Sequence, residues 1–210
     1  LREQLARVDR MEADKSEKDF TRLDKVVIGV CGGDGIGPII CGAARDILEY
    51  LLEAEIRAGK VELRDIEGLT IENRIACGKA IPDDTLEALK ACDVILKGPT
   101  TTPNAGDGMP NIESANVAMR KALDLYANVR PVRVPEQGID WTFFRENTEG
   151  SYAVGSQGQH VTDDLAIDFC VTTTEGTRRI ARRAFEYARA NEKGRVSVVT
   201  KANVIKTTDG

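Results

Sequence analysis

Three short apolar runs, separated by stretches with helical spacing, most constrain how this chain can fold. The runs are Lys25–Cys31, Val61–Ile66 and Asp93–Lys97. Their content of Val and Ile is typical of strands buried on both faces. Between them, Pro38 suits the first turn of a helix that we expect to reach about Ala58, and Pro82 precedes a second helix that ends near Ala91. Strands that alternate with helices predict a parallel sheet covered by helices, the α/β class.

A loop rich in Gly, Thr, Pro and Asn, residues 98–111, separates this pattern from a second series of elements. We expect helices at Ser114–Tyr126 and Glu175–Ala190, strands at Ala127–Val134, Trp141–Arg145 and Arg195–Thr200, and an extended segment at Val161–Thr174. The last helix carries four arginines that we expect on one solvated face: Arg178, Arg179, Arg182 and Arg183. Residues 1–24 are rich in charge with weak helical spacing and form an N-terminal extension.

Composition excludes several classes of function. With 29 basic and 34 acidic residues the net charge is −5, which argues against nucleic acid as a partner. No apolar run approaches the ~18 residues of a membrane helix, so we expect no membrane partner. A single histidine, His160, and the absence of a CxxC pair argue against a zinc site. The cysteines are expected as reduced thiols of a cytoplasmic protein: Cys31, Cys41, Cys77, Cys92 and Cys170.

The segment CGGDGIGP, residues 31–38, follows a strand and resembles a phosphate-binding loop. The Rossmann fingerprint G-x-G-x-x-G fails in both registers, because Pro38 or Ile40 stands where the third glycine should be. A P-loop needs Gly-Lys-Ser/Thr, and Gly37 is followed by proline. A tight turn from strand to helix therefore explains most of the glycine.

Polar residues in the helix expected at Ser114–Tyr126 and in the two strands expected after it suggest an anion site. Ser114 can cap the helix that follows it, and Asn116 and Arg120 are four residues apart and share one helix face. Arg130 and Arg145 lie in or at the end of predicted strands. Arginines that converge on a helix N-terminus would suit a ligand with several carboxylates. The alternative from spacing alone is that the arginines are surface charges and Ser114 only a cap.

Five motifs resemble, in order, those of the isocitrate/isopropylmalate dehydrogenase family, whose members are NAD(P)- and metal-dependent β-decarboxylating dehydrogenases. They are GDGIGP, KGPTTTP, SANVAMRKALDLYANVRPVR, FRENTEGSY and TKANVIKTTDG, within about residues 25–210. The resemblance implies that family's two-domain α/β fold, which is not a Rossmann fold. We expect part of the large domain at 25–125 and the small domain at 126–210, with a dimer arm at about 151–174.

The resemblance also implies roles for individual residues. Those expected to bind substrate are Ser114, Asn116, Arg120, Arg130 and Arg145. Tyr152 resembles the acid that protonates the enolate carbon, and Lys201 the residue that assists deprotonation of the substrate hydroxyl. That lysine comes from the partner subunit in the family, so a homodimer is implied. Thr101 and Thr102 resemble the segment that contacts the nicotinamide of NAD or NADP.

The resemblance favours isocitrate over the other substrates of the family. Ser114 and Asn116 are hydrogen-bonding groups that suit a carboxylate, where isopropylmalate enzymes carry apolar residues. Alternatives are homoisocitrate, another 3-substituted malate, or a regulatory subunit that binds without turnover. The aspartates that bind Mg²⁺ or Mn²⁺ in the family are expected beyond Gly210, and we expect the C-terminal part of that fold to be absent from this chain.

Overall fold

The computed structural model describes residues 2–13, 18–104, 106–155 and 157–210. It contains two compact units, one formed by residues 17–123 and the other by residues 1–16 and 124–210. Residues 14–17 of the predicted N-terminal extension and residue 156 of the predicted dimer arm lie outside the described residues.

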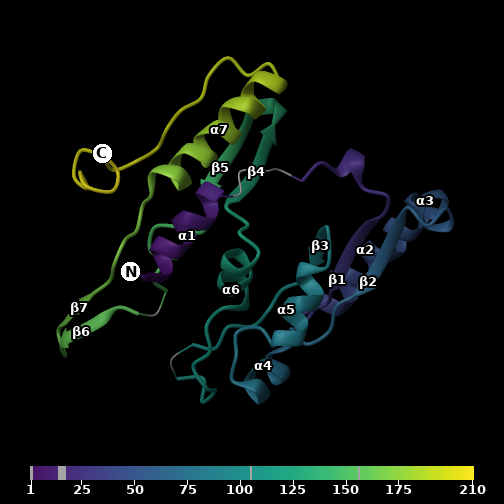
Figure 1. The fold of residues 1–210 in the computed structure, drawn as a ribbon, viewed down its shortest axis with the longest axis horizontal. Helices are drawn as coiled ribbons and strands as arrows, with labels where there is room; N and C mark the ends of the chain where they lie inside the picture. Colours follow the sequence, from purple (N-terminus) through teal and green to yellow (C-terminus); the bar gives the residue numbers. More distant parts are fainter. Residues whose placement is uncertain (1, 14–17, 105, 156) are drawn as a thin grey trace. The chain divides into compact units, whose positions relative to one another are not determined.

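The unit formed by residues 17–123 is built on a parallel sheet, as the sequence predicts. Its strands are β1 (Val26–Cys31), β2 (Val61–Asp65) and β3 (Val94–Lys97), in the order β2-β1-β3. Val30 of the central strand pairs with Asp65 on one side and Leu96 on the other. The carboxyl ends of the strands therefore lie at one edge of the sheet, and the loops that follow β1 and β3 start side by side (Figure 1).

The helices of this unit are α2 (Gly37–Leu51), α3 (Glu53–Arg57), α4 (Ile71–Cys77), α5 (Asp83–Lys90) and α6 (Ala115–Ala122). A 3₁₀ turn, η1, spans Phe20–Arg22. The single helix expected to reach Ala58 is interrupted at Leu52, whose φ of −108° and ψ of 17° leave the helical region. Helix α4, capped by Thr70 and ended by Gly78 at φ 66°, was not predicted. Helix α6 ends four residues earlier than expected, because Asp124 has a φ of 46°.

The core of this unit lies between the sheet and helices α5 and α6. Its buried side chains include Cys31, Leu69, Leu89 and Met119. Helix α2, in contrast, presents six exposed apolar side chains: Ile36 (its N-cap), Ile39, Ile40, Ile47, Tyr50 and Leu51. The helix is thus packed on the sheet by one face and leaves an apolar face uncovered.

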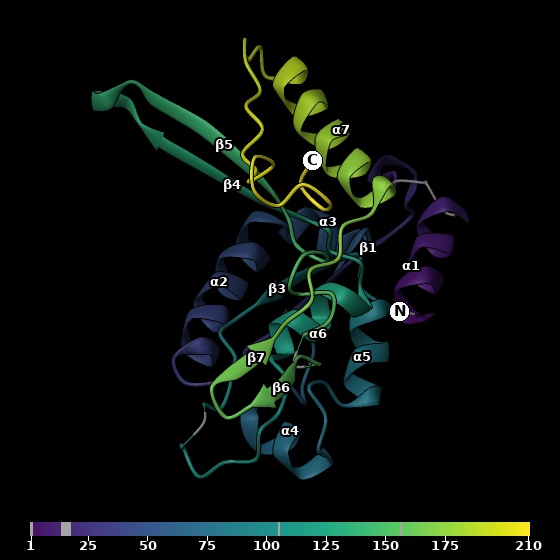
Figure 2. The ribbon, with the colours of Figure 1, turned by 90° about the vertical axis from the view of Figure 1, so that its left-hand side faces the viewer.

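The other unit is built around an antiparallel hairpin covered on one face by a helix. Strands β4 (Ala127–Val134) and β5 (Ile139–Glu146) are joined by the 3₁₀ turn η2 (Pro135–Gln137), and α7 spans Thr174–Ala190. Figure 2 shows β4 and β5 as two long paired strands whose connecting turn extends away from α7. Tyr187 of α7 contacts Phe144 with ring centroids 5.1 Å apart and shares a hydrogen bond of 3.1 Å with Thr142. The predicted strands and helix of this region are confirmed.

The expectation of one solvated arginine face on α7 is wrong for Arg179. Its guanidinium forms two hydrogen bonds with Asp124, of 2.6 and 2.9 Å, and a third with Thr148. It also lies over the ring of Tyr126 at 4.3 Å. Local spacing does not reveal this partner, because Asp124 is 55 residues away in the sequence.

The N-terminal helix α1 (Arg2–Ala13) packs within the same unit as α7. Arg7 forms an ion pair with Glu149, which is only 6% exposed and also accepts hydrogen bonds from Thr173, the N-cap of α7. Gln4 donates to the carbonyl of Ala153 at 3.2 Å. The described part of the extension is therefore a docked helix with specific polar contacts.

The predicted extended segment forms a small hairpin instead of one continuous strand. Strands β6 (Gln159–Thr162) and β7 (Leu165–Ile167) pair antiparallel with an irregularity between His160 and Thr162. The strand expected at Arg195–Thr200 is not formed: none of the described strands pairs with this segment, and Val199 is 94% exposed. A strand needs a hydrogen-bonded neighbour, which propensity alone does not supply.

Candidate active site

The glycine loop after β1 packs against the loop after β3, backbone on backbone. A Cβ atom added to Gly33, whose φ is +70°, would lie 2.1 Å from the carbonyl oxygen of Pro99. The amide of Asp34 donates to that same carbonyl at 2.8 Å, and the amide of Gly98 donates to Cys31 at 2.8 Å. The glycines therefore permit a close approach of two protein segments, and the Asp34 amide is already used. This is a physical reason why the loop resembles a phosphate-binding loop without being one.

Thr101 and Thr102, the predicted cofactor contacts, lie in this second loop with exposed side chains. The peptide of Thr101 is held from both sides. Its amide donates to Asp34 at 2.6 Å, and its carbonyl accepts from the guanidinium of Arg74 at 2.6 Å. The backbone is thus anchored while the side chain faces outward.

Ser114, Asn116 and Arg120 lie at the start and along one side of α6. Ser114 is the N-cap residue, but its side chain makes no capping hydrogen bond to the helix. Asn116 and Arg120 are half-buried, and no ion pair of Arg120 is found among the described residues. Helix α6 is anchored by Ala115 and Met119, which are buried.

Arg130 and Arg145, in the other unit, share one face of the β4–β5 hairpin. Arg145 pairs directly with Asn128, and Arg130 lies two residues further along β4. Directly opposed residues and residues two apart point to the same side of an antiparallel ladder. The Nε of Arg130 donates to Asn128 at 2.8 Å, which agrees with this placement. Both arginines are exposed, so their charges are accessible to an anionic ligand.

Tyr152 contacts Arg145 in two ways. An Nη2 N–H of Arg145 donates to the phenolic oxygen, and the guanidinium carbon lies 5.1 Å from the ring centroid. A guanidinium has only donors, so the tyrosine oxygen is the acceptor in this contact and its own proton points elsewhere. The hydroxyl therefore remains able to donate its proton to another group.

Tyr152 also lines a cavity of about 310 Å³ in this unit, together with Glu146, Glu149, Thr177 and Asp209. Asp209 accepts the backbone amide of Lys201 at 3.0 Å. That hydrogen bond, with those from Thr208 and Thr200, lowers the pKa of the Asp209 carboxyl from its ordinary value. The Lys201 side chain is exposed. The structure thus ties the Lys201 segment to the wall of the cavity that contains Tyr152.

Sequence reasoning missed two cations beside the Thr101 loop, the half-buried Lys97 and the fully buried Arg74. Lys97, at the end of β3, donates to the carbonyl of Gly98 at 2.8 Å and to Thr100 at 3.1 Å. Burial lowers the pKa of Lys97 and raises that of the neighbouring Cys31 to about 11. Arg74 is fully buried. The only signal for Arg74 was its position three residues after Ile71, on the apolar side of an unpredicted helix.

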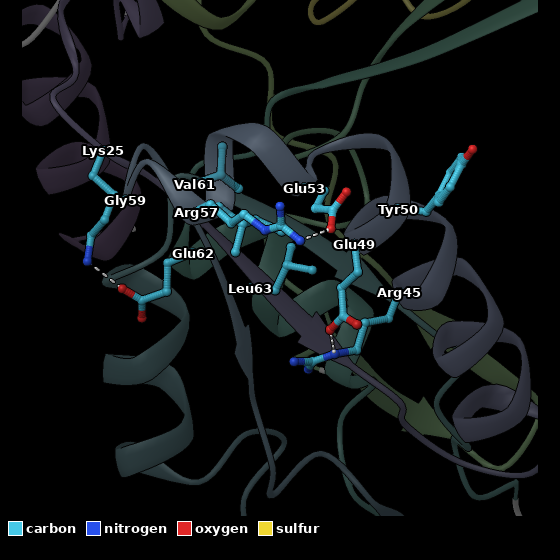
Figure 3. A pocket seen from close by; sticks show the side chains of 11 residues that line it. Lys25, Arg45, Glu49, Tyr50, Glu53, Arg57, Gly59, Val61, Glu62 and Leu63 are labelled. Carbon is cyan, nitrogen blue, oxygen red and sulfur yellow. Dashed lines mark hydrogen bonds and ion pairs between the residues drawn. The ribbon is translucent and has the colours of Figure 1, made fainter.

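A larger cavity, of about 850 Å³, lies beside β2 and contains none of the predicted residues. Figure 3 shows that its charged side chains pair with one another: Lys25 with Glu62, Arg57 with Glu53, and Arg45 with Glu49. Charges already paired at a surface offer little to an anionic or cationic ligand. We therefore place no function there.

Divalent metal binding has no ligand set in the part of the chain that the structure describes. No group of three or more His, Cys, Asp or Glu residues there could hold a metal ion. Mg²⁺ and Mn²⁺ take oxygen ligands, and the carboxylates of the described residues do not form such a group. Nor is any described helix long and apolar enough to cross a membrane.

Comparisons with known proteins agree with the motifs. The family model described as isocitrate/isopropylmalate dehydrogenase matches residues 27–210. Homoisocitrate dehydrogenase from Methanocaldococcus jannaschii is 38% identical, and the match covers 86% of this chain and 53% of that protein. NADP isocitrate dehydrogenase from Caldococcus noboribetus is 34% identical, and the match covers 89% of this chain and 49% of that protein. The crystal structure of isocitrate dehydrogenase from Methylococcus capsulatus superposes with a TM-score of 0.70 at 34% identity, over 88% of this chain and 54% of that one. The chain thus spans about half the length of these relatives. It belongs to the isocitrate/isopropylmalate dehydrogenase family.

Proposed function

We propose that this chain forms part of an NAD- or NADP-dependent dehydrogenase that converts isocitrate to 2-oxoglutarate by oxidative decarboxylation. The observation that carries the proposal is the contact between Arg145 and Tyr152, with Arg130 on the same hairpin face. Two accessible guanidiniums can bind carboxylates, and the adjacent phenol can deliver a proton. A proton donor beside a carboxylate site is what protonation of an enolate requires.

In this proposal each predicted residue has one task. Lys201, from the partner subunit of a homodimer, would assist removal of the proton from the C2 hydroxyl. NAD or NADP, when bound, would supply the acceptor for the hydride of C2. The bond to the C3 carboxylate then breaks, carbon dioxide leaves, and Tyr152 protonates the resulting enolate carbon. Thr101 and Thr102 would contact the nicotinamide. Mg²⁺ or Mn²⁺ remains an expected cofactor, but no step is assigned to it because its ligands are not among the described residues.

The start of α6 supports isocitrate as the substrate. Ser114 makes no capping bond, and Asn116 is half-buried beside Arg120. Ser114 and Asn116 would donate hydrogen bonds to the third carboxylate of isocitrate, and Arg120 would supply a positive charge. An isopropyl group at the same place would leave these polar groups without partners, which costs about 1–3 kcal/mol for each buried group. Homoisocitrate, which also ends in a carboxylate, is the nearest alternative, and one relative carries that name.

The proposal is tested by initial rates of cofactor reduction with the protein as its gene encodes it. We would compare isocitrate, homoisocitrate and 3-isopropylmalate, each with NAD and with NADP, in the presence of Mg²⁺. We expect the highest kcat/KM with isocitrate. Tyr152→Phe should lower kcat by about 10²-fold or more, whereas Tyr50→Phe, on exposed helix α2, should leave it unchanged.

Two other results would redirect the proposal. Higher kcat/KM with homoisocitrate would change the substrate and keep the chemistry. Binding of isocitrate in calorimetry without turnover of any acid would identify a regulatory subunit and refute the proposed enzyme. The cytoplasm, consistent with the free cysteines, is the proposed location.

A further inference from the structure

Arg74 is the most deeply buried charged side chain among the described residues, with 0% of its surface exposed. Its guanidinium donates to three backbone carbonyls, those of Ala80 at 2.8 Å, Thr101 at 2.6 Å and Glu113 at 3.0 Å. Burial lowers the pKa of Arg74 and the charge of Asp34 partly offsets this. A buried charge is costly unless its donors are used, and here each of the three nitrogens has an acceptor.

The acceptors of Arg74 bracket the loop that carries the predicted cofactor and substrate contacts. Thr101 lies near the start of the loop, and Glu113 is the residue directly before Ser114. One planar guanidinium therefore ties together two backbone points that are 12 residues apart in the sequence. The fork has fixed geometry, so it sets the spacing between these points as well as joining them.

Asp34 completes the anchorage from the opposite side of the same peptide. One carboxylate oxygen accepts the Thr101 amide at 2.6 Å, and the other accepts the amide of Ile71 at 2.8 Å. Ile71 is the first residue of α4, the helix that carries Arg74. Asp34 thus links the glycine loop, α4 and the Thr101 loop, and it leaves the Thr101 side chain exposed.

We infer that Arg74 and Asp34 are positioning residues, which set the distance between the Thr101 backbone and the start of α6. The inference rests on the proposed function, in which Thr101 contacts the nicotinamide and Ser114 the substrate. Hydride transfer requires cofactor and substrate to be held close to one productive geometry, and a displacement of about 1 Å can cost 10²-fold in rate. Neither Arg74 nor Asp34 needs to touch a ligand to exert this control.

Two conservative variants test the inference in the protein as its gene encodes it. Arg74→Lys keeps the charge but replaces a three-way fork by one ammonium, which cannot reach the same three carbonyls in the same geometry. Asp34→Asn keeps the shape but replaces one acceptor by an amide donor, so one of the two backbone amides loses its partner. Asp34→Asn is isosteric and half-buried, so it stays informative if Arg74→Lys fails to fold.

Matched controls separate positioning from the chemistry of the substitution itself. Asp107→Asn changes an aspartate in the same loop, whose carboxylate accepts the Asn104 amide at 2.8 Å. Arg57→Lys changes an exposed arginine paired with Glu53 on α3. Both controls should keep kcat and both KM values within about twofold of the unmodified protein, since neither contacts Thr101 or Glu113.

For Asp34→Asn and Arg74→Lys we expect KM for isocitrate and for the cofactor to rise together by about tenfold, and kcat to fall by a similar factor. We also expect faster amide hydrogen exchange across residues 99–104. A lower thermal midpoint with unchanged kcat and KM in the folded protein would mean a purely structural role and would overturn the inference.

The two proposals fail in different ways. If the unmodified protein turns over none of the three acids, the proposed function fails, and hydrogen exchange alone then decides whether Arg74 and Asp34 anchor the loop. If the protein is active and both variants behave like their controls, the proposed function stands and the positioning role is refuted. Unchanged exchange across residues 99–104 in Asp34→Asn would also refute it.

Discussion

Replacing Gly33 by alanine tests the close approach of the two loops that follow β1 and β3. Gly33 has a φ of +70°, and an added Cβ would lie 2.1 Å from the carbonyl oxygen of Pro99. Gly35, two residues later, provides a matched control. Its φ is +58°, yet an added Cβ there meets nothing within 4 Å. The two substitutions share the cost of the left-handed backbone and differ in the collision.

The magnitude follows from the two costs. An alanine in the left-handed region costs about 1–2 kcal/mol at either position. At Gly33 the carbonyl of Pro99 must also retreat by about 1.3 Å to restore the 3.4 Å of ordinary contact. That movement breaks the hydrogen bond from Asp34 to Pro99, which costs a further ~0.5–1.5 kcal/mol. We therefore expect Gly33→Ala to lower the free energy of unfolding by about 1.5–3.5 kcal/mol and Gly35→Ala by about 1–2 kcal/mol.

The assay is urea unfolding followed by far-ultraviolet circular dichroism, combined with hydrogen exchange of peptides that cover residues 26–41. Fluorescence is unsuitable, because the single tryptophan, Trp141, lies in the other unit. Gly33→Ala should also raise KM for the cofactor, since Pro99 is two residues from Thr101. Equal losses of stability for the two variants, within about 0.5 kcal/mol, would refute the reasoning, because the collision would then carry no cost.

Three further predictions concern single side chains. The ammonium of Lys18 and a backbone amide lower the pKa of the Asp93 carboxyl. The stability that this supplies is present above the ordinary pKa of about 4 and is lost as pH falls through the lower folded value. Asp93→Asn should therefore lower the urea midpoint at pH 7 and match the unmodified protein in strong acid. Iodoacetamide at pH 8 should alkylate the exposed Cys77 and spare Cys31, whose pKa of about 11 keeps it a buried thiol until the protein unfolds; mass spectrometry of peptides detects this. Glu149→Gln removes the buried partner of an α1 arginine and should destabilise its unit by about 3 kcal/mol, measured by tryptophan fluorescence in urea.

The strands of the parallel sheet were predictable because their signal is local. Each is a short apolar run bounded by turn residues, and the structure places β1, β2 and β3 within two residues of the predicted limits. Helix α5 was equally clear from Pro82 and the acidic residues that follow it. Helix α4 was missed because it is only seven residues long and its apolar face is interrupted by Arg74. A charged residue on a buried face contradicts the pattern that such predictions rely on.

The segment Arg195–Thr200 shows the opposite error: its sequence predicts a strand, but no neighbouring strand pairs with it in the described structure. Val198 and Val199 have strong strand propensity, yet they are 78% and 94% exposed and form no strand in the described structure. Strand propensity measures how a side chain fits a pleated surface that already exists. Without a neighbouring strand in register, the same residues have no ladder to join.

In the candidate site, too, contacts between residues close in the sequence were predictable, and contacts between distant residues were not. Motifs identified Arg145 and Tyr152, which are seven residues apart and meet on one side of the hairpin end. No motif identified the pairing of Gly33 with Pro99 or of Asp34 with Thr101, because these contacts join segments 66 and 67 residues apart. Gly33 of the first loop is therefore explained by a second loop that the sequence shows only as a separate motif. The resemblance to a phosphate-binding loop arises because both kinds of loop need a backbone without side chains. One admits a phosphate, and this one admits the segment that holds Thr101.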